Sequence, residues 1–98
     1  MNVDELMQVV RNERLDAPVL YGAGQPGLDD VVVRSDDGRW RVYLSDERGE
    51  PFAATLREFA NESDALQYAL QKLRQVSAAR VAKAALRAKQ AADGNTAT

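Results

Sequence analysis

The apolar residues of this 98-residue chain recur at the periods of helices and of strands in turn, and each change of period marks a new element. Near the N-terminus they lie three and four residues apart, as on one face of a helix. Asn2 precedes this pattern and can cap it, with Glu5 at the third helical position. The pattern predicts a first helix from about residue 3 to residue 13.

The following segment, residues 15–28, contains two prolines and three glycines, which interrupt both periods. We expect a loop there, with no more than a short edge strand at Val19–Tyr21. A β-branched run at Val31–Arg34 then predicts a strand. The turn residues Ser35–Gly38 predict that this strand enters a hairpin.

Two segments after this turn alternate between apolar and polar residues, as strands with one buried face do. The first has Trp40, Val42 and Leu44 on one side, and a turn at residues 46–50 follows it. A third strand, from about Phe52 to Phe59, repeats the alternation. We therefore expect an antiparallel meander, with Trp40 and Phe52 in the core.

Asn61 is positioned to cap a second helix that begins near Glu62. Its apolar stripe is strong for three turns and then thins to alanine, so we expect only the first half of the helix to be buried. A single helix as far as Ala92 would be about 45 Å long, whereas strands span about 20 Å. The second half must therefore protrude, fold back near Ser77 or pack on a partner, and we expect fraying from Gly94 onward.

Together these elements predict an α+β fold. It consists of an N-terminal helix, an antiparallel meander sheet of three to four strands, and a long C-terminal helix packed on one face of the sheet. We expect residues 1–76 to form a single α+β domain, because a chain of this size builds only one core. Residues 77–98 are expected to form a basic, alanine-rich helical extension.

The composition removes most catalytic chemistry. The chain has no cysteine and no histidine, so it lacks thiolate nucleophiles, the commonest metal ligand and the usual general base near neutral pH. The two members of each carboxylate pair are consecutive in sequence. On a strand such neighbours point to opposite faces, and in a turn their side chains usually bond to the backbone of the turn. The pairs are Asp29/Asp30, Asp36/Asp37 and Asp46/Glu47. We expect no enzyme activity, no cofactor and no metal site.

No membrane segment is expected either. No apolar run approaches the roughly 20 residues that a membrane span needs, and the first ten residues carry acids where a signal peptide has a basic region. These features predict a cytoplasmic protein that does not enter a membrane.

Charge is distributed unevenly along the chain. Residues 1–70 hold fourteen acids and seven bases, a net charge of minus seven, and residues 71–98 hold six bases and one acid, a net charge of plus five. An acidic body attracts cationic partners and repels nucleic acid. The alternative interpretation is ordinary solubilising charge.

Two further motifs are weaker. Gly22, Gly24 and Gly27 fit G-x-G-x-x-G, but Pro26 interrupts the motif and a strand follows it where a helix is needed to bind a nucleotide. Four bases of the second helix gather on one face and could contact phosphates, although no aromatic residues lie between them. They are Lys72, Arg80, Lys83 and Arg87. The alternative is that these bases form a solvated face of the helix or pair with the acids of the chain's own body.

Three local motifs resemble those of a known group of proteins. They are the sequence Asp37-Gly38-x-Trp40-x-Val42-Tyr43, the turn Asp46-Glu47-Arg48-Gly49, and the Phe-x-x-Glu-x-x-Ala spacing from Phe59 to Ala65. In this order they resemble small immunity proteins of bacterial polymorphic toxin and contact-dependent growth inhibition systems. The likeness covers about a third of the chain, and the basic tail after Val76 departs from it.

The resemblance implies an antitoxin that binds a cognate toxin, the C-terminal toxin domain of a large secreted protein and commonly a nuclease. A nuclease grips phosphate and is basic, so an acidic surface could occupy its positive groove. The residues expected to bind this partner are Asp29, Asp30, Asp36, Asp37, Tyr43, Asp46, Glu47, Arg48 and Glu50, with Tyr21 as a further anchor. Two alternatives stay open: a nucleic-acid-binding regulator that uses the basic helix, and a homodimer formed through the C-terminal helix.

Overall fold

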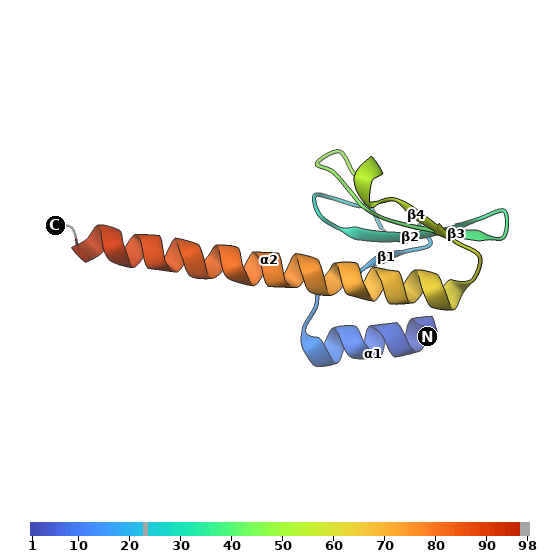
Figure 1. The fold of residues 1–98 in the computed structure, drawn as a ribbon, viewed down its shortest axis with the longest axis horizontal. Coiled ribbons are helices and arrows are strands. Elements are labelled where there is room, and N and C mark those ends of the chain that lie inside the picture. The colour runs from blue at the N-terminus through green and yellow to red at the C-terminus, as the bar shows by residue number, and fades with distance from the viewer. Residues whose placement is uncertain (23, 97–98) are drawn as a thin grey trace.

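A computed structural model describes residues 1–22 and 24–96, with side chains described as far as Gln90. Figure 1 shows a small sheet with two helices on one side of it, one of which extends far beyond the sheet. The elements in chain order are α1 (Val3–Glu13), β1 (Val19–Leu20), β2 (Val31–Asp36), β3 (Arg39–Leu44), the 3-10 helix η1 (Ala53–Thr55), β4 (Arg57–Phe59) and α2 (Glu62–Thr96). The α+β class is confirmed.

Both helices begin where the sequence predicts. The Asn2 side chain accepts a hydrogen bond from the Glu5 amide at 2.8 Å, and the Asn61 side chain accepts one from the Asp64 amide at 2.9 Å. Each bond satisfies one of the amide donors that the first helical turn leaves without a partner.

The sheet has the strand order β1-β2-β3-β4, and the hairpin between β2 and β3 is antiparallel. The expectation of a purely antiparallel meander is wrong, because β1 pairs with β2 in parallel, with Val19 opposite Val32. Tyr21 and Gly22 have φ angles of 52° and 81°, so the chain turns immediately after β1. Parallel strands need a connection that returns to the starting end of the first strand. The loop between β1 and β2 is long enough for this, whereas a two-residue turn is not.

The predicted third strand is also wrong in its extent. It begins only at Arg57, because residues 46–56 form a connection on the face of the sheet away from the helices (Figure 1). The Thr55 hydroxyl donates to the Phe52 carbonyl at 2.6 Å and accepts from the Leu44 amide at 2.9 Å, which fixes η1 to the end of β3. Phe52 is 57% exposed and does not lie in the core.

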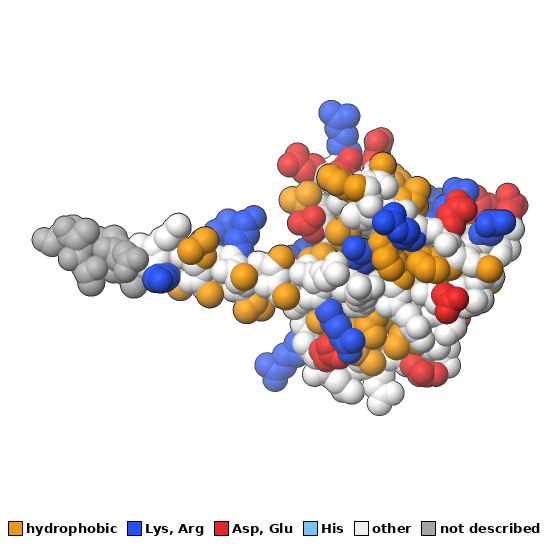
Figure 2. Space-filling view, viewed as in Figure 1, with side chains coloured by type: hydrophobic (Ala, Val, Ile, Leu, Met, Phe, Trp, Pro, Cys, Tyr) orange, Lys and Arg blue, Asp and Glu red, His pale blue; other side chains and the backbone are white. Residues whose placement is uncertain are grey.

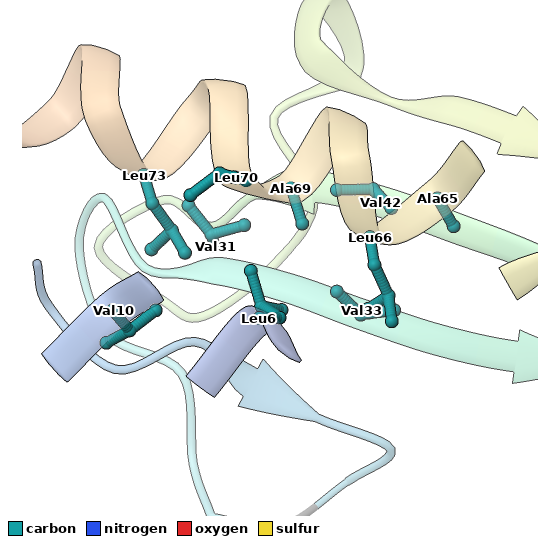
Figure 3. Packing of buried hydrophobic residues seen from close by; sticks show 10 residues of the cluster. All are labelled: Leu6, Val10, Val31, Val33, Val42, Ala65, Leu66, Ala69, Leu70 and Leu73. Atoms are coloured by element: carbon teal, nitrogen blue, oxygen red, sulfur yellow. The ribbon is translucent and has the colours of Figure 1, made fainter. Parts of the chain in front are cut away.

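The core lies between the sheet and the two helices, as Figure 3 shows. Leu66 and Leu73 of α2 lie over the valines of β2 and β3, and Leu6 of α1 completes the layer. Trp40 is half-buried against this cluster, as expected for its side of β3. Full burial of a leucine contributes about 1.5–3 kcal/mol. The cluster consists of Leu6, Val10, Val31, Val33, Val42, Ala65, Leu66, Ala69, Leu70 and Leu73.

The second half of α2 protrudes beyond the sheet (Figure 1); it does not fold back near Ser77. Among the side chains described, as far as Gln90, the last half-buried one is Ser77, and every residue from Ala78 to Gln90 is exposed. The molecule therefore measures 60 × 29 × 21 Å. The helix continues through Gly94 to Thr96, and residues 97 and 98 lie outside the described part; fraying from Gly94 onward stays a prediction. Alanine, lysine and arginine favour the helix even without a core.

No helix within the described residues has both the length and the apolar character that crossing a membrane requires.

Candidate functional site

The turn at residues 46–50 is built around the side chain of Asp46. One carboxylate oxygen of Asp46 accepts hydrogen bonds from the Arg48 amide at 2.8 Å and from the Glu50 amide at 2.9 Å. This is the Asx geometry expected of an aspartate at a turn. Asp46 therefore keeps the neighbouring side chains in place, while its charge adds to the acidity of the turn.

This turn rests on the loop that precedes β2. Gly49 has a φ of 80°, and a Cβ atom built on it would lie 2.6 Å from the Pro26 carbonyl oxygen, so only glycine fits here. The fully buried Ser45 donates from its hydroxyl to the Gly27 carbonyl oxygen. The Asp30 carboxylate accepts from the Gly27 amide at 2.7 Å. Residues 26–30 and 44–52 thus form one joined surface, which we call the loop end of the sheet.

A groove of about 470 Å³ lies in the loop end. Two large hydrophobic side chains flank it, Leu28 at 56% exposed and Phe52 at 57% exposed. Exposed apolar side chains that share a hollow mark interaction sites far more often than scattered ones do. The lining residues are Leu28, Asp29, Leu44, Ser45, Asp46, Glu47, Arg48, Phe52 and Thr55. We call this hollow the loop-end groove.

The structure brings together about half of the residues predicted to bind a partner. Asp29, Asp46, Glu47 and Arg48 line the loop-end groove, and Glu50 belongs to the same turn. Figure 2 shows acidic side chains on the body close to the point where α2 leaves it.

Four of the predicted residues lie elsewhere or are engaged within the fold. Asp36 and Asp37 are at the β2–β3 hairpin, at the opposite end of the sheet, so the acids do not form one surface. Asp30 is half-buried and bonded to its own loop. Tyr43 is only 4% exposed and lines a hollow with Pro51 and Leu56 of the connection, so it cannot serve as an exposed anchor.

Tyr21 is held against the start of α2. Its hydroxyl donates to the Glu62 carboxylate at 2.6 Å. Partial burial, together with this hydrogen bond to a carboxylate, raises the pKa of Tyr21 to about 12. Tyr21 therefore stays protonated at neutral pH and has a structural partner.

The sequence did not indicate the two exposed hydrophobic side chains of the groove, Leu28 and Phe52. Both are hydrophobic residues among turn residues, with Gly27 before one and Pro51 before the other. That position could have suggested exposure. The alternation that starts at Phe52 instead favoured a strand.

The basic face of α2 is smaller than its sequence indicates. The Lys72 ammonium lies 5.2 Å from the centre of the Tyr68 ring, and Arg80 forms an ion pair with Asp16. Lys83 and Arg87 form no ion pair with any described residue. Two of the four bases are thus engaged within the chain.

The glycine-rich loop leads into β2 and not into a helix, so the geometry that binds a nucleotide phosphate is not formed there. Among the described residues, no three acids lie close enough together to hold a metal ion. Comparison of the chain with protein-family models, with curated proteins and with solved structures found no match.

Proposed function

We propose that the chain is an immunity-type protein that binds and neutralises a cognate toxin domain, and that the loop-end groove is its contact surface. The observation that carries this proposal is the pairing of two exposed hydrophobic side chains, Leu28 and Phe52, with an acidic rim at one groove. The resemblance of the local motifs to immunity proteins supplies the class of partner.

The two kinds of side chain contribute differently to binding. Phe52 and Leu28 contribute affinity through burial of their apolar side chains, about 1.5–3 kcal/mol for each side chain that a partner covers fully. Asp29 and Glu47 attract a basic surface over distance and raise the rate of association. A nuclease that binds phosphate offers such a surface, so its own substrate site fits an acidic groove.

Binding of nucleic acid is the weaker candidate. Arg80 and Lys72 are already engaged with Asp16 and Tyr68, and the loop end carries the opposite charge to the one that phosphates need. A protein partner with a basic surface suits both the groove and its charge.

The test compares the wild-type chain with the variant Leu28→Ser/Phe52→Ser as bait in a lysate of the source cells. The matched control is Val81→Ser, which removes an exposed hydrophobic side chain of α2 that does not line the groove. We expect the wild type and the control to retain one stoichiometric polypeptide through a high-salt wash, and the groove variant to lose it.

The captured polypeptide is then expressed in cells with and without the chain. It should arrest growth by itself, and wild-type chain should restore growth where the groove variant does not. Capture of a polypeptide that is not toxic, or equal rescue by the groove variant, would contradict the proposal.

A further inference from the structure

The chain carries two surfaces of opposite charge, and the distal bases of the helix, Arg87 and Lys89, lie beyond the acidic loop end of their own molecule. No acid occurs between Asp64 and Asp93, and the exposed part of α2 carries Arg80, Lys83, Arg87 and Lys89. The loop end is acidic, through Asp29, Asp46, Glu47 and Glu50. Figure 2 shows basic side chains along the protruding helix, and Figure 1 shows that the helix leaves the body without a bend.

The helix passes the loop end before it protrudes. Asp29 and Leu44 share a hollow with Val76, Ala79, Arg80 and Lys83 of α2, so these two bases lie beside the loop end of their own chain. This hollow sets the level of the loop end along the helix axis. Lys89 lies ten residues beyond Ala79, about 15 Å further along a straight helix. The distal bases therefore extend away from the acids of their own chain.

We infer that a second copy of this chain is the partner of the protruding helix, and that it lies antiparallel to the first. A two-fold axis that crosses α2 near Lys83 brings Lys89 of one copy level with Ser77 of the other, beside its loop end. The same operation applies in reverse, so each basic helix meets the acidic loop end of the other copy. This interface uses the same surface twice and closes as a dimer.

A stable interface needs more area than a pair of helices provides, so each protruding helix must also contact the body of the other copy. Residues 78–90 span only about 20 Å, and a helix pair of that length buries less than the roughly 800 Å² per partner of a standard interface. Val81 at 67% and Leu86 at 55% exposed supply apolar area on the helix. Leu28 and Phe52 supply it on the loop end.

The dimer goes beyond the proposed function and does not rest on it, because it requires only this chain. It also predicts that dimerisation covers the loop-end groove. A basic toxin domain would then compete with the second copy for the same surface.

The test exchanges the charges of the two surfaces. The helix variant is Lys83→Glu/Arg87→Glu/Lys89→Glu, and the loop variant is Glu47→Lys/Glu50→Lys. The control, Asp36→Lys/Asp37→Asn, alters acids at the opposite end of the sheet. Asp46 and Asp29 are left unchanged because Asp46 holds the turn and Asp29 has a φ of 60°. Circular dichroism verifies that every variant is folded.

Sedimentation equilibrium of the purified proteins at low salt, from about 1 to 100 µM, covers the range in which micromolar dimers form. We expect twice the chain mass for the wild type and the control, and the mass of one chain for each charge variant alone. An equimolar mixture of the helix and loop variants should again give twice the mass, because both contacts then join opposite charges.

A wild-type mass of one chain throughout this range would overturn the inference. So would dimers that persist in both charge variants, or a mixture of these variants that stays monomeric. None of these outcomes bears on the toxin, since the experiment contains only this chain.

Discussion

At the scale of single residues, Gly49 joins the two loops that form the loop-end groove. Its φ of 80° and the Pro26 carbonyl oxygen both oppose a side chain. Gly38 has a similar φ of 74° but nothing within 4 Å of its Cβ position, so it provides a matched control. Gly38→Ala should lower the free energy of unfolding by about 1–2 kcal/mol, the cost of a left-handed alanine.

Gly49→Ala should cost about 1–3 kcal/mol more than Gly38→Ala, since the backbone near Pro26 must also move. Urea denaturation of both variants measures the difference. Equal losses would mean that the contact between Gly49 and Pro26 does not hold the loops together.

Tyr21 makes the free energy of unfolding depend on pH in the alkaline range. Its folded pKa of about 12 lies above the ordinary value of 10.0, so the folded state binds the phenolic proton more tightly than the unfolded state does. The resulting stabilisation is complete below about pH 10 and is lost as the pH rises towards about 12. Absorbance of tyrosinate during a pH titration should contain a late transition that Tyr21→Phe removes and Glu62→Gln moves to lower pH. A late transition that survives in Tyr21→Phe would assign it to another tyrosine.

At the scale of elements, the sequence predicts what local chemistry determines. The caps Asn2 and Asn61 fix both helix starts, and the turn at Ser35–Gly38 fixes the hairpin, because each depends on residues only a few positions apart. The parallel pairing of β1 with β2 was missed because no local pattern specifies which distant strand an edge strand joins.

The candidate site was only partly predictable for the same reason. Alternation placed Phe52 in the core and Tyr43 outside it, and the structure has the reverse, because the connection after β3 crosses the second face of the sheet. The acids of the turn at residues 46–50 were identified correctly as neighbours, since they are close in sequence. Their separation from Asp36 and Asp37 depends on the strand direction, which single residues do not reveal.

Helix α2 has a buried half and an exposed half, and these should contribute very differently to stability. A chain that ends after Lys83 keeps the ion pair between Arg80 and Asp16 and loses no buried side chain among the described residues. Its free energy of unfolding should change by less than about 0.5 kcal/mol. Leu73→Ala, in the buried half, should cost about 2–5 kcal/mol. Urea denaturation at low protein concentration compares the two, and a loss above 1 kcal/mol on truncation would show that the distal helix stabilises the fold.

At the scale of the whole molecule, shape and charge follow from the same protruding helix. The Cα radius of gyration is 16.1 Å, whereas a compact domain of this length has about 13 Å. The extension separates positive charge from a body that carries most of the acids. The acids of the body are themselves divided, with one cluster at the loop end and two further acids, Asp36 and Asp37, between Arg34 and Arg39 at the hairpin.

This division predicts that net charge alone does not govern the encounter with a basic partner. At low salt, Glu47→Lys/Glu50→Lys should slow association with the captured partner by at least about tenfold, because the reversed charges lie beside the groove. Asp36→Lys/Asp37→Asn, at the far end of the sheet, should slow it by less than about threefold. Both effects should shrink as added salt shortens the screening length to about 10 Å at 0.1 M. Stopped-flow mixing of the monomeric chain with the partner at two ionic strengths measures these rates. If the two variants slow association equally, the partner responds to the total charge of the body, and the loop end has no special part in the encounter.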